Sequence, residues 1–362
     1  MSFEGRRQPL KPTMMDVASR AGVSQATVSL VLNGSPGARL SQSTRKKVKK
    51  AADELGYQLV RRGLNKASRD QKIIGFVADE LTADPWMPLA FDGAREKALE
   101  YGISMTLAVT RGEDVSGDIA FDHVIQQPLL GLIYGTVLTR LVDPPKVLFE
   151  RPSVLVNCYD SKRRLTSVLP AELLGGRTAA ERLIKAGRRR IGLINGQDGI
   201  DASRDRLRGY RQALSSNDIP FDPAYVYPGN WEPSAGYEGT KALLSLDNPP
   251  DAIFCANDMM ATGCYDALKE MGLRIPQDVA VIGFDDREIA QFMRPPLTTL
   301  ILPHYEMGAI AAELLIDLTS GLQNHHDQIK VECHLVERAS VEMTQSNQDS
   351  SGVSAMEASN TR

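Results

Sequence analysis

Short apolar runs alternate with amphipathic stretches along the chain from Ile73 onwards. The runs are IIGFVAD (73–79), ISMTLAV (103–109), LLGLIYG (129–135), SVLVNCYD (153–160), RIGLING (190–196), AIFCAND (252–258) and VAVIGFDD (279–286). Apolar residues recur at helical spacing between them, in 89–101, 171–187, 204–216, 234–246 and 259–272. Buried strands that alternate with helices are typical of parallel sheets with helices on both faces. The pattern predicts an α/β core of two lobes, divided near Pro170.

Residues 13–33 carry a different pattern, which predicts two short helices separated by a tight turn. Thr13 can cap the first helix, and Gly22 can adopt the positive φ that the turn needs. Ser24 can cap the second helix, whose buried stripe is Val28, Val31 and Leu32. This arrangement is typical of a helix-turn-helix, whose second helix reads the major groove of DNA. The alternative is an ordinary helical hairpin within a larger core.

The next residues favour DNA over the hairpin alternative. The loop GSPGAR can place Arg39 against a phosphate or a base edge. Ser41 is expected to begin a third helix that ends near Leu55. Its basic run, TRKKVKK, would pair with phosphates, and such contacts fix position on DNA rather than sequence.

Charge is distributed unevenly between the head and the rest of the chain. Residues 1–72 contain fifteen Lys or Arg and five Asp or Glu, a net charge of +10. The whole chain has a net charge of −3, which leaves −13 for residues 73–362. A basic segment around a helix-turn-helix is the electrostatic signature of nucleic-acid binding.

Residues 12–57 contain the motif DVA-x-x-AGVS-x-x-TVS-x-V-x-N, followed by S-x-x-TR and ELGY. They resemble the DNA-binding head of the lactose/galactose repressor (LacI/GalR) family, and the resemblance continues to about residue 342. It implies an all-α helix-turn-helix head followed by a two-lobed α/β core like that of periplasmic binding proteins. The expected divisions are a headpiece at 1–57, a hinge at 58–71, a core at 72–342 (lobe 1 at about 72–169 and 300–328, lobe 2 at about 170–299 and 329–342) and a disordered tail at 343–362.

The expected DNA contacts lie in the head and the hinge. Residues on the outer side of the second helix would face base edges, and the full set is Thr13, Ser24, Gln25, Ala26, Thr27, Ser29, Leu30, Asn33, Arg39, Thr44 and Leu64. In the family, the hinge wedges a leucine into the minor groove and kinks the DNA. This chain has Lys66 at the matching position, with Leu64 two residues earlier. Two interpretations of residues 58–71 remain open: a shifted hinge helix that inserts Leu64, or a flexible basic tether.

A small-molecule site is expected where the carboxyl ends of the parallel strands open into a crevice. Polar residues follow the predicted strands there, and Asp, Asn and Arg side chains suit the paired hydroxyls of a sugar. The resemblance matches Arg204, Trp231, Asn257 and Asp285 to effector-binding positions of the family, and Asp79 and Asn157 complete the set. Trp231 would supply an apolar plate for a sugar ring. The structural alternatives are that Asp258 caps a helix and that Arg204 pairs with Asp201 or Asp205 on the surface.

Other classes of protein lack support in the sequence. It has no GxxxxGK[ST] loop, no GxGxxG after a strand and no GxSxG elbow, so no catalytic residue, cofactor or enzymatic activity is expected. The five histidines form no metal pattern, and the four cysteines fit buried, reduced thiols. No apolar run could span a membrane and no signal peptide is apparent, so a cytoplasmic protein without membrane contact is expected.

Together these features predict a transcriptional regulator, specifically a repressor of carbohydrate-utilisation genes. A homodimer is expected on a pseudo-palindromic double-stranded operator, because one short helix reads only a half-site. The resemblance implies that a sugar bound between the lobes controls operator affinity. A purine-like co-repressor is an alternative effector. A sugar-binding protein without a DNA role would need a signal peptide and no basic head.

Overall fold

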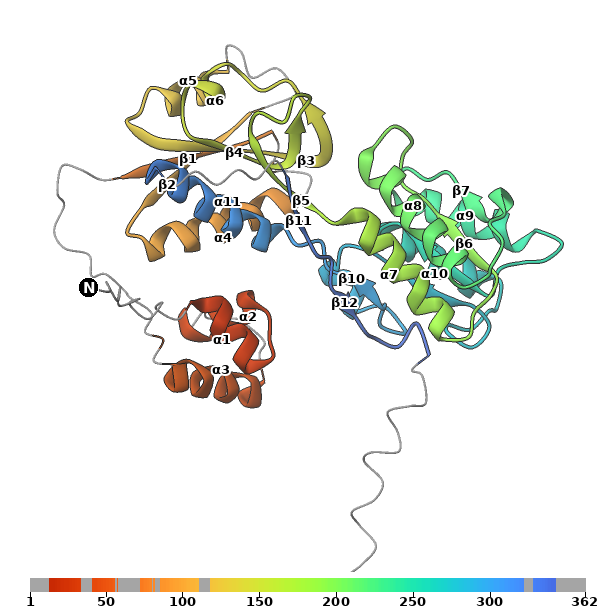
Figure 1. The fold of residues 1–362 in the computed structure, drawn as a ribbon. Coiled ribbons are helices and arrows are strands. Elements are labelled where there is room, and N and C mark those ends of the chain that lie inside the picture. The colour runs from red at the N-terminus through yellow and green to blue at the C-terminus, as the bar shows by residue number, and fades with distance from the viewer. Residues whose placement is uncertain are drawn as a thin grey trace, which may run out of the picture. The chain divides into compact units, whose positions relative to one another are not determined.

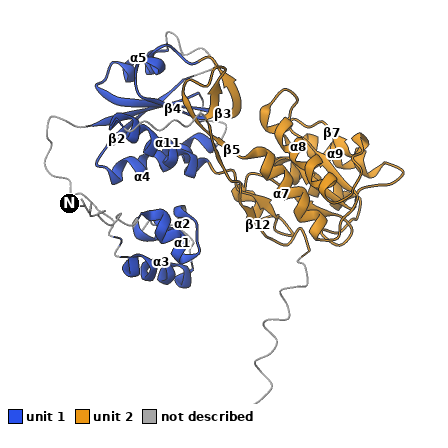
Figure 2. Ribbon diagram, viewed as in Figure 1, with its two compact units in different colours: residues 1–137, 144–156, 304–326 blue, residues 138–143, 157–303, 327–362 orange. Residues whose placement is uncertain are grey.

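The computed structural model describes residues 13–33, 41–55, 57, 72–79, 81, 85–110, 118–321 and 328–342. The chain divides into two compact units (Figure 2). Unit 1 comprises residues 1–137, 144–156 and 304–326, and unit 2 comprises residues 138–143, 157–303 and 327–362. The division falls between Val156 and Asn157, within a continuous buried strand, and not near Pro170 as the sequence pattern suggested.

Three helices form the headpiece, namely α1 (Met14–Ala21), α2 (Gln25–Asn33) and α3 (Gln42–Leu55). The predicted start of α1 is confirmed as a capping box: Asp16 N donates to Thr13 Oγ1 over 3.3 Å, and Thr13 N donates to Asp16 Oδ2 over 2.7 Å. Gly22 ends α1 with a φ of 66°. The small core of the headpiece is built on Val17, Val28 and Val48, which are fully buried. These contacts fix α2 against the other two helices.

In unit 1, β1 (Ile73–Ala78) pairs in parallel with β2 (Ser104–Val109) and with β3 (Leu129–Val142), whose residues from Leu138 onwards belong to unit 2. The helices are α4 (Trp86–Glu100), α5 (Ile119–Ile125), α6 (Val147–Glu150) and α11 (His304–Thr319). Figure 1 shows α4 and α11 on one side of the sheet and α5 and α6 on the other. Glycines let α4 and α11 approach closely, since a Cβ at Gly93 would lie only 1.9 Å from the carbonyl oxygen of Tyr305.

Unit 2 contains a four-stranded parallel sheet in the order β7-β6-β8-β9. Its strands are β6 (Ile191–Ile194), β7 (Val226–Tyr227), β8 (Ala252–Cys255) and β9 (Ala280–Ile282). The main helices are α7 (Glu172–Lys185), α8 (Asp201–Ser216), α9 (Pro233–Leu244) and α10 (Asp258–Glu270). Short 3₁₀ turns lie at Pro223–Tyr225 and Glu288–Gln291. Figure 1 shows α7 beside α8 and α9 beside α10, so both sheet faces are covered as predicted.

Five further strands complete the sheets of the described residues. β4 (Ser153–Asp160), β5 (Thr166–Pro170) and β11 (Gln328–Val331) extend the sheet that contains β1, in the order β11-β5-β4-β3-β1-β2. β10 (Thr299–Leu300) and β12 (Leu335–Val336) form a separate antiparallel pair. All four cysteines are buried and none of them forms a disulfide bond, as expected. No helix in the described part of the chain is long and apolar enough to cross a membrane.

Candidate functional site

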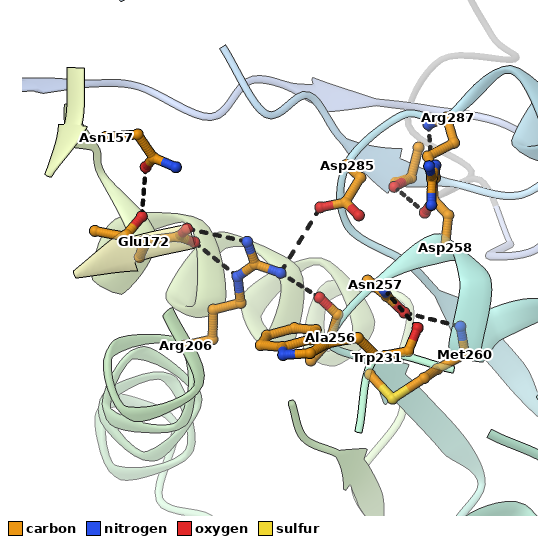
Figure 3. Close-up of polar contacts among 12 residues, drawn as sticks. Asn157, Glu172, Arg206, Trp231, Ala256, Asn257, Asp258, Met260, Asp285 and Arg287 are labelled. Atoms are coloured by element: carbon orange, nitrogen blue, oxygen red, sulfur yellow. Dashed lines mark hydrogen bonds and ion pairs between the residues drawn. The ribbon is translucent and has the colours of Figure 1, made fainter. Parts of the chain in front are cut away.

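A buried polar cluster lies in unit 2, and the guanidinium of Arg206 is at its centre (Figure 3). Arg206 Nε donates to Glu172 Oε2 over 2.7 Å, and Arg206 Nη2 donates to Glu172 Oε1 over 3.0 Å. Arg206 Nη1 donates to the carbonyl oxygen of Ala256 and lies 3.8 Å from Asp285 Oδ1. The side chains of Arg206 and Glu172 are each only 3% exposed. Arg206 therefore links α7, the end of β8 and the turn after β9.

Close helix packing brings Arg206 to Glu172. A Cβ at Gly176 of α7 would lie 2.3 Å from the carbonyl oxygen of Arg206, so α8 can approach this closely only beside a glycine. The guanidinium carbon lies 3.6 Å from the ring centroid of Phe284 and 5.6 Å from that of Trp231. Both distances are within the range of cation–π attraction. The cluster thus holds one cation against carboxylates and aromatic rings.

Burial shifts the ionisation of this cluster. It raises the pKa of Asp285 well above its usual range, and Arg206 only partly opposes that shift. Burial alone would lower the pKa of Arg206, but the carboxylates of Glu172 and Asp285 outweigh it and raise the pKa, so Arg206 stays charged. Burial also raises the pKa of Asp258 to about 7, although its carboxylate accepts hydrogen bonds from Thr299 Oγ1 (2.6 Å) and Arg287 N (2.8 Å).

The turn after β9 has an unusual backbone. Asp285 has a φ of 114° and Asp286 a φ of 54°, values that non-glycine residues seldom adopt. Asp285 N donates to the carbonyl oxygen of Leu300 over 2.7 Å, and the Asp286 carboxylate pairs with Arg338 over 2.6 Å. These contacts hold the strained turn and present Asp285 to Arg206. Strain of this kind is concentrated at functional sites.

Trp231 forms an apolar wall beside the cluster, with a φ of 72°. Its ring lies directly on Gly196, where a Cβ would be 2.0 Å from the indole. Asn257 fixes the loop, because Asn257 Nδ2 donates to the carbonyl oxygen of Trp231 over 3.0 Å. Asn257 Oδ1 also accepts from Met260 N over 2.8 Å and caps α10, so the structural alternative that Asp258 is the cap is wrong. Asp258 instead occupies the first turn of the helix.

Three buried polar atoms near Arg206 have no hydrogen-bond partner among the described residues. They are Asn195 Oδ1 at the end of β6, Ser203 Oγ in the first turn of α8 and Trp231 Nε1. Ser203 lies one helical turn before Arg206, and the Trp231 ring covers the glycine that follows Asn195. Buried polar groups are nearly always paired in folded proteins. A polar ligand would satisfy these three atoms.

A second candidate surface lies on the headpiece. Thr27 N donates to Ser24 Oγ over 3.1 Å, and Thr44 N donates to Ser41 Oγ over 3.0 Å, so serines begin α2 and α3 as predicted. Gln25 is the half-buried first residue of α2. On α3, the lysine side chains are exposed, namely Lys46, Lys47, Lys49 and Lys50. Helix starts and exposed lysines are suited to phosphate groups.

Comparison with known proteins identifies this combination of parts. Residues 13–58 match the family described as "Bacterial regulatory proteins, lacI family", and residues 180–341 match "Periplasmic binding protein-like domain". The HTH-type transcriptional repressor CytR of Escherichia coli is 32% identical over 341 residues, which cover 93% of this chain and 98% of CytR. The chain belongs to the LacI family. It is a DNA-binding transcriptional regulator with a ligand-binding core domain.

Solved structures of LacI-family regulators agree with this assignment. The complex of the transcriptional regulator CelR with cellobiose has a TM-score of 0.63 and 31% identity, and the match covers 91% of this chain and 99% of CelR. The Lac repressor dimer bound to operator and the anti-inducer ONPF has a TM-score of 0.64 and 28% identity, over 91% of this chain and 98% of that one. The predicted fold class is therefore confirmed.

Arg204, the arginine expected at the effector site of this LacI-family chain, does not join the cluster. Its side chain is 56% exposed and pairs with Asp201 (2.6 Å) and Asp205 (3.2 Å), as the surface alternative described. The physical reason is helical geometry: residues two apart are about 200° apart around an α-helix. Arg206 lies on the buried stripe of α8 with Ser203 and Tyr210. This helical spacing is the signal in the sequence that could have identified Arg206 as the buried arginine.

The other expected effector residues have their own partners. Asn157, with a φ of 58°, is buried in unit 2 and its Oδ1 accepts from Thr139 Oγ1 over 2.5 Å. Asp79 is buried in unit 1, where its Oδ1 accepts from Val137 N over 3.0 Å. Trp231, Asn257 and Asp285 lie around Arg206 as described above. Glu172, Ser203 and Asn195 complete the surroundings of Arg206. Neither Glu172 nor Ser203 was predicted, whereas Asn195 lies at the end of the predicted strand in 190–196.

One predicted DNA contact is placed differently. The hydroxyl of Ser29 is buried and donates to Glu96 Oε2 of α4 over 3.0 Å, so it does not face outwards as predicted. The predictions for the side chains of Ala26, Leu30 and Asn33, and for Arg39 and Leu64, fall outside the described residues. The same holds for the hinge at 58–71 and the tail at 343–362.

Proposed function

We propose that this regulator represses carbohydrate-utilisation genes, and that a small sugar bound at the Arg206 cluster of unit 2 controls its affinity for operator DNA. The observation that carries the proposal is that three buried polar atoms, on Asn195, Ser203 and Trp231, have no hydrogen-bond partner among the described residues. CelR, a relative of this chain, binds cellobiose in its solved complex. The proposed activity is the binding of DNA and a sugar, without catalysis. We expect the protein to work in the cytoplasm, because its operator DNA is there.

The chemistry of the cluster supports a sugar. Asn195 Oδ1 and the Asp285 carboxylate can accept hydrogen bonds, whereas Trp231 Nε1 can donate one and Ser203 Oγ can do either. Adjacent sugar hydroxyls need both kinds of partner. The Trp231 ring adds an apolar plate for the ring face of a pyranose. Arg206 would contribute to sugar binding by holding Glu172, Asp285 and the neighbouring groups in position around the ligand.

The aromatic residues argue against a purine-like co-repressor. A flat base would be best held between two aromatic faces, but the guanidinium of Arg206 already lies 3.6 Å from the centre of Phe284. Phe76 is fully buried in unit 1 and packs edge-on against Phe91, with 5.6 Å between ring centroids. Trp231 therefore remains as one aromatic face at the cluster, which favours a sugar.

On the DNA side, we infer a homodimer on a pseudo-palindromic operator. Helix α2 has nine residues, which suffices to read one half-site, and a second copy would read the other. Gln25 begins the reading helix, and the lysines of α3 would neutralise phosphates. Linkage then requires that operator DNA and the sugar change each other's affinity by the same factor.

Intrinsic tryptophan fluorescence tests the ligand part of the proposal. The full chain would be titrated with ribose, cellobiose and other uncharged sugars, and with adenine and guanine. We expect a saturable change with a sugar that is lost in Trp231→Phe. Trp86, buried in unit 1 and stacked on His304 at 5.6 Å, supplies the constant background. A change with purines alone would contradict the sugar proposal and support a co-repressor.

A further inference from the structure

We propose that Glu172 determines the charge of the effector: by occupying the paired donors of Arg206, it makes the site reject anionic ligands and accept uncharged polyols. The anionic ligands in question are phosphorylated sugars and sugar acids. This inference rests on the proposed ligand site and specifies which class of molecule that site takes.

The geometry of the ion pair carries the first step. A guanidinium recognises a carboxylate or phosphate through two parallel N–H donors, and this is the arrangement that Arg206 makes with Glu172 at 2.7 and 3.0 Å. Glu172 thus takes the place that an anionic group of a ligand would need. The third nitrogen, Nη1, donates to the carbonyl oxygen of Ala256 and faces Asp285.

The position of Glu172 makes it hard to displace. It is the first residue of α7, where the positive end of the helix dipole favours a carboxylate. Its side chain is 3% exposed, and α7 is held against α8 by the contact of Gly176 with the backbone of Arg206. Figure 3 shows Glu172 and Asp285 on opposite sides of the guanidinium.

The surrounding charges carry the second step. Arg206 faces the carboxylates of Glu172 and Asp285, and, beyond the effect of burial, Asp258 at the start of α10 raises the pKa of Asp285 through its own charge. Two further cations act on these carboxylates: Arg338 is paired with Asp286, and Arg287 donates its backbone N–H to Asp258 while its charge lowers the pKa of Asp285. Even with Asp285 protonated, Glu172 alone neutralises Arg206. An anionic ligand would therefore add uncompensated negative charge to a buried site, which is costly. A hydroxyl can instead donate to Asp285 without that cost.

Inorganic phosphate is a probe that does not depend on knowing the effector. Glu172→Gln keeps the shape of the side chain but removes its charge, and should bind phosphate at least about tenfold more tightly than the wild type by calorimetry. Glu181→Gln is the matched control, because it removes the same charge from α7 where Glu181 pairs with Arg177 at 2.7 Å. This control should bind phosphate like the wild type. Adding Arg206→Met to Glu172→Gln should abolish the gain.

A folded Glu172→Gln protein without the gain would overturn the proposal. So would a wild type that binds phosphate as tightly as the variant and loses this binding in Arg206→Met.

The wild type provides a test that does not depend on the folding of a variant. For each sugar that changes Trp231 fluorescence, its phosphorylated form should bind at least about tenfold more weakly. Equal or tighter binding of the phosphorylated form would overturn the proposal. If no sugar binds but Glu172→Gln still gains phosphate affinity, Glu172 blocks Arg206 as proposed and the sugar function fails instead.

Discussion

Glu172 and Arg206 form an ion pair with two hydrogen bonds in the interior of unit 2, and each side chain is 3% exposed. Two residues away, Arg204 pairs with Asp201 at 2.6 Å but is 56% exposed. The two ion pairs have similar distances, but the first is buried and the second is exposed to solvent. Removing one partner of a buried pair leaves an unpaired charge, whereas water replaces a lost partner at the surface.

This contrast predicts different effects on stability. Arg206→Ala should lower the free energy of unfolding of unit 2 by about 3–5 kcal/mol, because Glu172 would remain buried without its partner. Arg204→Ala should cost less than about 1 kcal/mol, since its pair is exposed. Urea unfolding followed by far-UV circular dichroism measures both changes. Equal, small losses would show that the buried pair contributes little.

Stability should also depend on pH through Asp258. Burial raises the pKa of this carboxyl to about 7, above its ordinary value of 3.8. Between pH 3.8 and about pH 7 the Asp258 carboxyl of the folded chain holds a proton that the unfolded chain has released. The free energy of unfolding therefore falls as the pH rises through this range, and this fall is complete above about pH 7. Asp285, whose pKa burial also raises, acts in the same direction.

Asp258→Asn should therefore flatten the decrease in melting temperature between pH 5 and pH 7, whatever its effect on stability at a single pH. Asp278→Asn is the control. Its partner Arg274 lowers the pKa of Asp278 to about 2, so the stability it adds is lost only as the pH falls below its ordinary value of 3.8. A slope unchanged by Asp258→Asn would show that this carboxyl is already ionised in the folded chain.

On the headpiece, residues that read the base sequence should be distinguishable by mutation from residues that contact phosphates. Gln25→Ala should reduce the preference for operator over random DNA more than it reduces binding to random DNA. Lys47→Ala should weaken both by a similar factor and reduce the salt dependence by about one ion, because an exposed lysine contacts phosphate. Fluorescence anisotropy with the two duplexes at several salt concentrations distinguishes these results. Equal losses for Gln25→Ala would remove it from the base-reading residues.

The sequence alone predicted much of the fold because apolar periodicity reports burial directly. All seven apolar runs overlap a strand, and all five amphipathic stretches overlap a helix. The short strands β7, β10 and β12 have two residues each, too few for a period to appear. Helix α11 was missed because much of its surface is buried, which leaves little alternation between apolar and polar positions.

The site was predicted less well, for a different reason. Asp285 could be located from its place after a predicted strand, because such positions meet at one edge of a parallel sheet, whereas Trp231 was matched only through the family resemblance. The effector-binding role was given to Arg204 instead of Arg206 because both arginines stand in the run RDRLRG. Only the buried helical stripe, which Arg206 shares with Ser203 and Tyr210, distinguishes the two. Glu172 could not be predicted as its partner, since that pairing depends on the glycine contact between α7 and α8.

An uncharged sugar bound at Arg206 is proposed to control the affinity of the headpiece for operator DNA. The most direct test measures the affinity of the full chain for a duplex that it selects from a random library, with and without each sugar. Wild type and Arg204→Ala should respond alike to one uncharged sugar, by about tenfold or more. Arg206→Lys, which keeps the charge but not the paired donors, should bind the duplex normally and lose the response. A full response in Arg206→Lys would contradict the account.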